Sequence, residues 1–295
     1  MQLQTRLLEK LLNTVKGAFN GTSLPLMRKG QERLGTIGIR SLSGRVEFSF
    51  EQFDNFEAAL ACPKNGENGE LAVLYLHGGA YVSGGISYAK SFGGTLSEML
   101  LAPVLCVNYR KAPENPYPAA VEDALFAYNR LREMFPTRKI AVVGESAGGG
   151  LSLALGLKIK EEKGIMPDLF AVISPWSDLS FSGVSYLTNT KTDPTLSAES
   201  LKNFARQYIG ENDPKNPFIS PVYGDFTGFP PVLVIAGTEE LLHSDSLLTV
   251  SALIRGGVDY ELHLEKGMWH VYPLYPTAEA EIAKQKIKDF ILNER

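Results

Sequence analysis

One serine lies in a sequence that could make it a nucleophile. Residues 144–148 read Gly-Glu-Ser-Ala-Gly, preceded by an apolar run, 140–144, and followed by an alanine- and leucine-rich segment. A Gly-x-Ser-x-Gly pentapeptide between a strand and a helix places its serine on a sharp, strained turn, where small neighbours leave room for it. The turn would also direct the Ala147 amide and the positive end of the helix toward negative charge beside Ser146. We therefore expect Ser146 to be a catalytic nucleophile.

A histidine must accept the proton of this serine, because a serine hydroxyl is a weak nucleophile. Of the four histidines, His77 follows an apolar run in a glycine-rich loop, His243 opens a predicted helix and His263 alternates within a predicted strand. His270 lies in a loop after the last predicted strand, where a doubly wound sheet places its ligands. Its position suits the chain order serine, acid, histidine, so we expect His270 to be the base.

The third member of such a triad is a carboxylate that fixes the histidine tautomer and stabilises the imidazolium. We expect it in the loop after the predicted strand 232–236, where Glu239, Glu240 and Asp245 all qualify. Asp245 is expected to begin a helix, where its charge would stabilise the helix amino terminus. The residues of this loop alone leave the choice open.

The elements that position these residues follow from the hydrophobic pattern. Short apolar runs alternate with longer segments of helical periodicity from residue 71 onward, which predicts parallel strands joined by helices. Expected strands are 71–76, 104–109, 140–144, 170–174, 232–236 and 260–264, with an antiparallel pair upstream at 45–50 and 56–61. Expected helices are 87–101, 118–135, 147–163, 198–209, 245–255 and 278–292. Most of the strands are apolar throughout, as strands covered on both faces should be.

Two segments depart from this alternation. Near the amino terminus, apolar residues recur at helical spacing among charged ones, which predicts an amphipathic helix containing Leu3, Leu7, Leu8, Leu11, Leu12, Val15 and Phe19. Packing against the body of the protein is favoured for this helix over a role at a membrane surface. Residues 177–231 are rich in Ser, Thr, Asn, Pro and Gly. A long irregular insertion in a compact domain is usually a lid or a binding segment.

Composition excludes several functional classes. The 295 residues contain 29 Lys and Arg against 33 Asp and Glu, and the net charge of -4 leaves no electrostatic footprint for nucleic acid. Cys62 and Cys106 stand among apolar neighbours, which predicts buried thiols in a reducing compartment rather than a disulfide. The longest uncharged stretch, 71–89, is too rich in glycine and polar residues to span a bilayer. We expect a soluble cytoplasmic protein without a stable membrane anchor.

The loop after the first buried strand points to a known family. It reads His77-Gly78-Gly79-Ala80-Tyr81 and resembles the His-Gly-Gly-Gly loop of the hormone-sensitive-lipase-like branch of the α/β-hydrolases. The resemblance continues through 108–120, the nucleophile turn, 174–179, 220–221 and 230–231 to His270. It implies an α/β fold with a mostly parallel eight-stranded sheet and helices on both faces. The chain would form a single domain, 1–295, with a helical cap built from about 1–40 and 177–231.

The resemblance also implies an oxyanion hole. In this family the amides of the later small residues of the glycine loop, and of the residue after the nucleophile, receive the oxyanion. Carried over here, the donors are Gly79, Ala80 and Ala147, with Gly78 shaping the turn. Ala80 stands where the family usually has a third glycine, and its methyl group would narrow that wall.

The choice of acid follows from the same resemblance. The family's common acid motif, Asp-Pro-Leu, lies thirty residues before the histidine, and counting back from His270 gives Glu240-Leu241-Leu242. Glu240 is therefore the first choice, Glu239 the second and Asp245 the third. The longer glutamate side chain would move the carboxylate relative to the family's aspartate.

These residues predict a carboxylesterase that hydrolyses a small-molecule ester with a short acyl chain through an acyl-Ser146 intermediate. No metal or cofactor is expected, because no group of His, Cys and Asp has ligand spacing. The same apparatus would act on an amide, as in deacetylation, because the tetrahedral chemistry is shared. A non-catalytic receptor on this fold is the alternative of another class, but such receptors typically lose the histidine, and His270 is present. The oligomeric state stays open, a homodimer being one option.

Overall fold

The computed structural model describes residues 3–19 and 23–292. The strands are β1 Val46–Gln52, β2 Glu57–Pro63, β3 Leu71–Leu76, β4 Val104–Asn108, β5 Lys139–Glu145, β6 Leu169–Ile173, β7 Val232–Gly237 and β8 Tyr260–Glu265. The α-helices are α1 Leu3–Phe19, α2 Leu24–Ser41, α3 Ile86–Leu100, α4 Ala119–Met134, α5 Ala147–Glu161, α6 Ser185–Thr188, α7 Ala198–Ile209, α8 His243–Arg255 and α9 Ala278–Leu292. Short 3₁₀ turns lie at Pro221–Tyr223 and Tyr272–Leu274.

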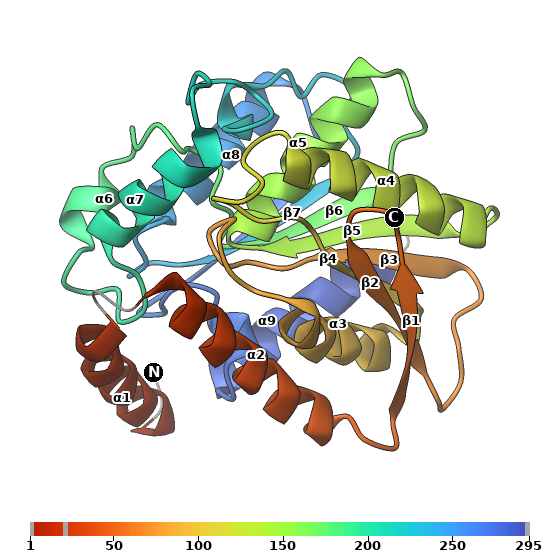
Figure 1. The fold of residues 1–295 in the computed structure, drawn as a ribbon, viewed down its shortest axis with the longest axis horizontal. Coiled ribbons are helices and arrows are strands. Elements are labelled where there is room, and N and C mark those ends of the chain that lie inside the picture. Colours follow the sequence, from red (N-terminus) through yellow and green to blue (C-terminus); the bar gives the residue numbers. More distant parts are fainter. Residues whose placement is uncertain (1–2, 20–22, 293–295) are drawn as a thin grey trace.

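Eight strands of the described chain form one twisted sheet in the order β1-β2-β4-β3-β5-β6-β7-β8 (Figure 1). The pairs β1–β2 and β2–β4 are antiparallel, and every later pair is parallel. The side chains of β3 are all buried, whereas those of β8 are exposed or half-buried because β8 is an edge strand. The predicted α/β fold and its mostly parallel eight-stranded sheet are confirmed, and the element boundaries agree within a few residues.

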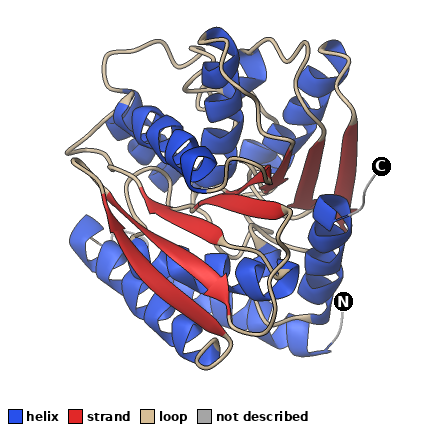
Figure 2. Cartoon of the chain, turned by 90° about the vertical axis from the view of Figure 1, so that its right-hand side faces the viewer, coloured by secondary structure: helices blue, strands red, loops and turns tan. Residues whose placement is uncertain are grey.

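Helices cover both faces of the sheet (Figure 2). Buried side chains of α4, α5 and α8 fill the core on one face, and those of α3 and α9 fill it on the other. Within the described part of the chain, no helix is both long and apolar enough to cross a lipid bilayer. Cys106 is fully buried, as expected, but Cys62 is only half-buried because it lies near the end of β2, next to the edge strand β1.

Helix α2 was not predicted from the sequence. Gly35 and Gly38 interrupt its apolar pattern, yet both are required by its packing against α3. A Cβ atom at Gly35 would overlap the backbone of Ser87, and one at Gly38 would overlap the side chain of Ser91. The close packing of α2 against α3 requires glycine at these positions. The apolar periodicity that would predict α2 is therefore missing from the sequence.

Of the segments expected to form a cap, α1, α6 and α7 lie at the left of the molecule in Figure 1, and α2 runs from there along α3. From the later segment, the ring of Tyr208 in α7 stacks on Tyr81 with 3.8 Å between ring centroids. From the amino terminus, α2 packs along α3, and Leu8 and Leu12 of α1 reach the core. Residues 1–2 and 20–22 of the expected cap, and the side chains of Leu3, Val15 and Phe19, lie outside the described part of the chain.

Candidate active site

Ser146 forms the turn between β5 and α5. Its backbone has φ 56° and ψ -124°, a left-handed conformation that costs a residue other than glycine of order 1–3 kcal/mol and that sharp nucleophile turns adopt. Small neighbours permit the turn: a Cβ at Gly144 would overlap the carbonyl oxygen of Gly148, and one at Gly148 would overlap the backbone of Leu76. The serine side chain is therefore presented at the carboxyl end of the sheet, where the protein still leaves it 9% exposed.

A chain of hydrogen bonds connects Ser146 to a buried carboxylate. Nε2 of His270 lies 2.9 Å from Oγ of Ser146, and Nδ1 of the same ring lies 2.7 Å from Oε2 of Glu240. With the proton of the neutral ring on Nδ1, Nδ1 donates to Glu240 and Nε2 accepts from the serine hydroxyl. The structure brings together the serine, the histidine and the preferred acid of the sequence analysis.

The carboxylate of Glu240 is held by two further donors. Its Oε1 accepts a hydrogen bond from the amide of Gly237 at 2.8 Å and one from the hydroxyl of Ser174 at 3.0 Å. Oγ of Ser174 in turn accepts from the amide of Val271, the residue after His270. Ser174 thus fixes the acid and the histidine loop at once. The sequence analysis did not assign it this role; the available signal was a polar residue directly after a buried strand.

The other two carboxylates of the acid loop point elsewhere. Glu239 is half-buried, and its side chain accepts from the hydroxyl of Thr238 at 3.3 Å. Oδ2 of the buried Asp245 accepts from the amides of Ser177 and Asp178. Burial, reinforced by the charge of Asp178, raises the pKa of the Asp245 carboxyl well above its usual range. Asp245 lies in the first turn of α8, as the sequence predicted, and its carboxyl also fixes a loop beside the sheet.

The remaining histidines lie away from this hydrogen-bond chain. The ring of His77 stacks on Tyr109, and burial is the main cause that lowers the pKa of His77 to about 3. His243 contacts the carbonyl of Gly237 at the start of α8. His263 is a half-buried strand residue of β8 beside Glu265. All three positions match the non-catalytic interpretation of these side chains.

The glycine loop after β3 presses against the nucleophile, because a Cβ at Gly78 would overlap Glu145 and approach Cβ of Ser146 within 2.9 Å. The backbone is left-handed at three consecutive residues, with φ 121° at Gly79, 55° at Ala80 and 62° at Tyr81. The positive φ at Ala80 explains in physical terms why glycine suits this position.

The amides around the nucleophile divide into two groups. The amide of Gly78 donates to Oε1 of Glu145 at 2.5 Å, so it is engaged in shaping the loop. The amides of Gly79, Ala80 and Ala147 donate to no other described residue. Ala147 is the first residue of α5, where the helix dipole adds positive potential. These three free amides can donate to an oxyanion that forms beside Ser146.

Glu145 is a buried carboxyl that the sequence analysis did not assign. It precedes the nucleophile, and its Oε1 also lies 3.3 Å from the hydroxyl of Tyr75. Burial raises the pKa of Glu145 to about 7, although the amide of Gly78 and nearby hydroxyls favour the charged form. Because the same carboxyl holds Gly78, Glu145 couples the nucleophile turn to the glycine loop.

Residues 189–193 hold the acid loop from outside. Nδ2 of Asn189 donates to the carbonyls of Thr238 and Glu240, both at 3.0 Å. Oδ2 of the fully buried Asp193 accepts from the amide of Leu241 at 2.8 Å. Nζ of Lys16 in α1 donates to the carbonyl of Asp193 at 2.5 Å. The acid loop is therefore fixed by the later insertion, which is itself tied to α1.

The electrostatics of the site favour a protonated His270. Burial opposes the charged ring, but the hydrogen bond and charge of Glu240, followed by the charges of Asp193 and Glu145, outweigh it, so the pKa of His270 lies above its ordinary value. A histidine of this kind can take the proton of Ser146 and keep it while a tetrahedral intermediate exists.

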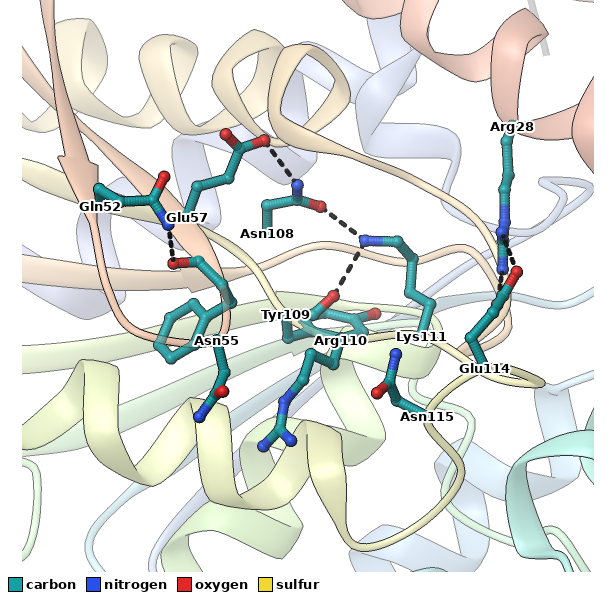
Figure 3. Close-up of a pocket in the computed structure, with 11 residues that line it drawn as sticks. Arg28, Gln52, Asn55, Glu57, Asn108, Tyr109, Arg110, Lys111, Glu114 and Asn115 are labelled. Atoms are coloured by element: carbon teal, nitrogen blue, oxygen red, sulfur yellow. Dashed lines mark hydrogen bonds and ion pairs between the residues drawn. The ribbon is translucent and has the colours of Figure 1, made fainter.

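A polar cavity of about 370 Å³ lies around the residues that follow β4 (Figure 3). Lys111 lies in it between Oδ1 of Asn108 and the carbonyl of Tyr109, and Arg28 pairs with Glu114 at the other end. No residue of the hydrogen-bond chain from Ser146 to Glu240 lines this cavity. Its charged groups hold loops in place: Arg28 also donates to the carbonyl of Val82, just beyond the glycine loop.

Arg110 and the two tryptophans have structural roles. Arg110 forms an ion pair with the buried Asp123 at 2.7 Å and fixes the segment after β4. Trp176 and Trp269 are at most 1% exposed, so they pack in the core and offer no platform to a substrate.

Comparison with known proteins finds a matching family, related sequences and similar solved structures. Residues 73–274 match a family model described as an alpha/beta hydrolase fold. The chain is 36% identical over 204 residues to an acetyl-hydrolase of Streptomyces hygroscopicus, covering 69% of this chain and 68% of that one. It is 30% identical over 207 residues to an ethyl acetate hydrolase of Pseudomonas putida, covering 68% and 65% of the two chains. The solved structure of an esterase from the bacterial hormone-sensitive lipase family matches with a TM-score of 0.87 and 28% identity over 96% of both chains. That of EstE5 soaked with p-nitrophenyl butyrate matches with a TM-score of 0.91 and 31% identity, over 99% of this chain and 98% of that one.

Proposed function

The chain belongs to the α/β-hydrolase family as a carboxylesterase of its hormone-sensitive-lipase-like branch, and we propose that it cleaves short-chain acyl esters through an acyl-Ser146 intermediate. The observation that carries this proposal is the unbroken hydrogen-bond chain from Oγ of Ser146 through His270 to Glu240. A serine on a strained turn, a histidine in one tautomer and a buried carboxylate are the parts that acyl transfer requires.

In the proposed first step, Nε2 of His270 removes the hydroxyl proton of Ser146 while Oγ forms a bond to the ester carbonyl carbon. The carbonyl π electrons move to oxygen, which receives hydrogen bonds from the amides of Gly79, Ala80 and Ala147. When the carbonyl re-forms, the bond to the alkoxide breaks, and His270 gives its proton to the departing oxygen. The products of this step are an alcohol and acyl-Ser146.

The second step repeats the first with water in place of the serine. His270 takes a proton from water, the hydroxide oxygen adds to the acyl carbon, and Ser146 leaves with the proton returned by the histidine. Glu240 stays charged throughout and stabilises the imidazolium in both steps.

Relatives support a short acyl chain. Two curated relatives are an acetyl-hydrolase and an ethyl acetate hydrolase, and one matching crystal was soaked with a butyrate ester. Ala80, whose methyl group replaces a hydrogen in the glycine loop, is consistent with a small acyl group there.

The test is a panel of p-nitrophenyl esters from acetate to palmitate, with p-nitroacetanilide as the amide partner of the acetate ester. We expect kcat/KM to be highest at acetate or butyrate and to fall beyond about eight carbons, with the anilide far slower than its ester. An optimum at long chains would contradict the proposed acyl class. A faster anilide would favour an amidase, and binding without turnover of any ester would favour a receptor.

We also propose a cytoplasmic location, supported by Cys62 and Cys106, both unpaired within the described chain. Fractionation of the producing cell should recover the protein with reduced thiols. Recovery in an oxidising compartment would contradict this location.

A further inference from the structure

The outer face of α2 carries basic and apolar side chains side by side. Because Gly35 and Gly38 face α3, the opposite side of the helix faces away from the protein. Six exposed residues share that outer side at helical spacing: Leu26, Lys29, Arg33, Leu34, Ile37 and Arg40. The three apolar side chains are each more than half exposed, and the three basic ones form no ion pair with another described residue. No exposed acidic residue of α2 shares this side, because Glu32 turns inward and accepts from the amides of Ser87 and Tyr88.

Helix α1 repeats the pattern. Its inner side carries Leu8 and Leu12, which pack against the core. The outer side carries Arg6, Lys10, Leu7 and Leu11, all exposed, the two leucines about 60% so. We call the outer sides of α1 and α2 together the amphipathic face. In Figure 1, α1 lies at the lower left of the molecule and α2 runs from beside it along the lower side, outside the sheet.

The charge of this region is opposite to that of the rest of the protein. Residues 1–41 contain seven Lys and Arg against two Glu, whereas the remainder of the chain carries 22 basic and 31 acidic residues. A second copy of this chain would bring the same positive face against itself, so charge disfavours self-association there. Basic side chains next to exposed leucine and isoleucine match an anionic lipid surface, which attracts the charges and accepts the apolar groups.

We propose that the amphipathic face of α1 and α2 binds reversibly to the surface of an anionic lipid bilayer. Such docking would hold the enzyme where apolar esters dissolve. Helix α2 also contacts the residues that follow the glycine loop. Oε1 of Gln31 accepts from the amide of Gly84, and Nε of Arg28 donates to the carbonyl of Val82. Helix α2 therefore connects the amphipathic face to the residues that follow the glycine loop.

Sedimentation of the full-length Ser146→Ala variant with lipid vesicles tests this proposal without any turnover. We expect binding to vesicles of phosphatidylcholine with about one third phosphatidylglycerol, little binding to phosphatidylcholine alone, and release as salt rises. Replacing Lys29, Arg33 and Arg40 by serine should lower the partition coefficient about 100-fold, or about fivefold for each charge. The matched control replaces Lys202, Lys266 and Lys286, which are exposed elsewhere, and should bind anionic vesicles far better than the face variant.

The apolar contribution is tested in the same way. Leu34→Ser with Ile37→Ser should weaken binding about tenfold, whereas Ile254→Ser with Ile282→Ser, at similarly exposed sites on α8 and α9, should not. Failure to bind anionic vesicles at low salt would overturn the proposal, as would equal loss in the face and control variants. A dimer that only the face variants dissociate would show that a second copy covers the face. None of these outcomes depends on esterase activity, so they leave the proposed function to its own test.

Discussion

Nδ1 of His270 lies 2.7 Å from Oε2 of Glu240, and this contact separates one carboxylate from two neighbours that the sequence left as rivals. Glu239 and Glu240 are adjacent in the sequence, yet of these two only the Glu240 carboxylate lies within hydrogen-bond distance of the His270 ring. Its second oxygen is fixed by Gly237 and Ser174, so the carboxylate cannot turn away without losing two more hydrogen bonds.

Glu240→Gln should therefore lose about 10³- to 10⁴-fold in kcat, because the imidazolium loses its charged partner and the tautomer is no longer fixed. Glu239→Gln is the matched control and should stay within about threefold of wild type. Asp245→Asn should change thermal stability more than kcat, because the Asp245 carboxyl accepts from the amides of Ser177 and Asp178 and so fixes a loop away from His270. The measurement is the kcat of these three variants in steady-state kinetics on p-nitrophenyl butyrate. A crippled Glu239→Gln beside an active Glu240→Gln would refute the assignment.

The pH dependence of kcat/KM should report the raised pKa of His270. Because the neutral ring is the base, activity rises with pH through that pKa, and the acidic limb should fall above pH 6.5. The raised pKa of His270 also makes stability depend on pH, in the opposite direction to activity. The stabilisation of the folded protein by protonated His270 is full below pH 6.5 and is lost as pH rises through the raised pKa. An acidic limb well below pH 6 would contradict this account of the site.

Asp193 should influence that limb without touching the substrate. It is buried, holds the Leu241 amide and places a negative charge near His270. Asp193→Asn should lower kcat about 10- to 100-fold, the size expected when a hydrogen bond to a charged group is lost, and should move the acidic limb to lower pH.

Asp178→Asn is the control for Asp193→Asn, because Asp178 is an equally buried carboxylate in a similar turn that binds no amide of the acid loop. It should lower stability and leave the limb in place. An unchanged limb in Asp193→Asn would mean that Asp193 serves only the fold.

Ala80→Gly should stabilise the protein slightly. Alanine in the left-handed region costs about 1–2 kcal/mol of folding free energy, which glycine would relieve. Glycine also gives the unfolded chain more conformational entropy, and this offsets about half of the relief. We expect a net gain of about 0.5–1 kcal/mol, an increase in melting temperature of about 1–3 °C, with kcat/KM on the acetate ester within about threefold. A lower melting temperature in calorimetry would show that the Ala80 methyl group makes packing contacts that outweigh the strain.

The sequence predicted those elements whose conformation depends on residues close together in the chain. Buried parallel strands appear as apolar runs, and the turn around Ser146 needs small residues at fixed spacing, so both were visible in the sequence. Ser174 and Asp193 were not, because each reaches the acid loop across the fold, 66 residues from Glu240 and 48 from Leu241 respectively. The direction in which Glu239 and Glu240 point is likewise set by packing, which no spacing encodes. Helix α2 was hidden because its contact with α3 requires glycine where a helical pattern would show apolar residues.

The most direct test of the central claim is covalent labelling of the active enzyme with a fluorophosphonate, followed by peptide mass mapping. Attack by an activated serine on phosphorus expels fluoride and leaves a stable phosphonyl ester. We predict one equivalent of label on Ser146, loss of esterase activity in parallel with labelling, and no label in Ser146→Ala or after unfolding. Label on any other residue, or full esterase turnover by Ser146→Ala free of contaminating esterase, would contradict the account.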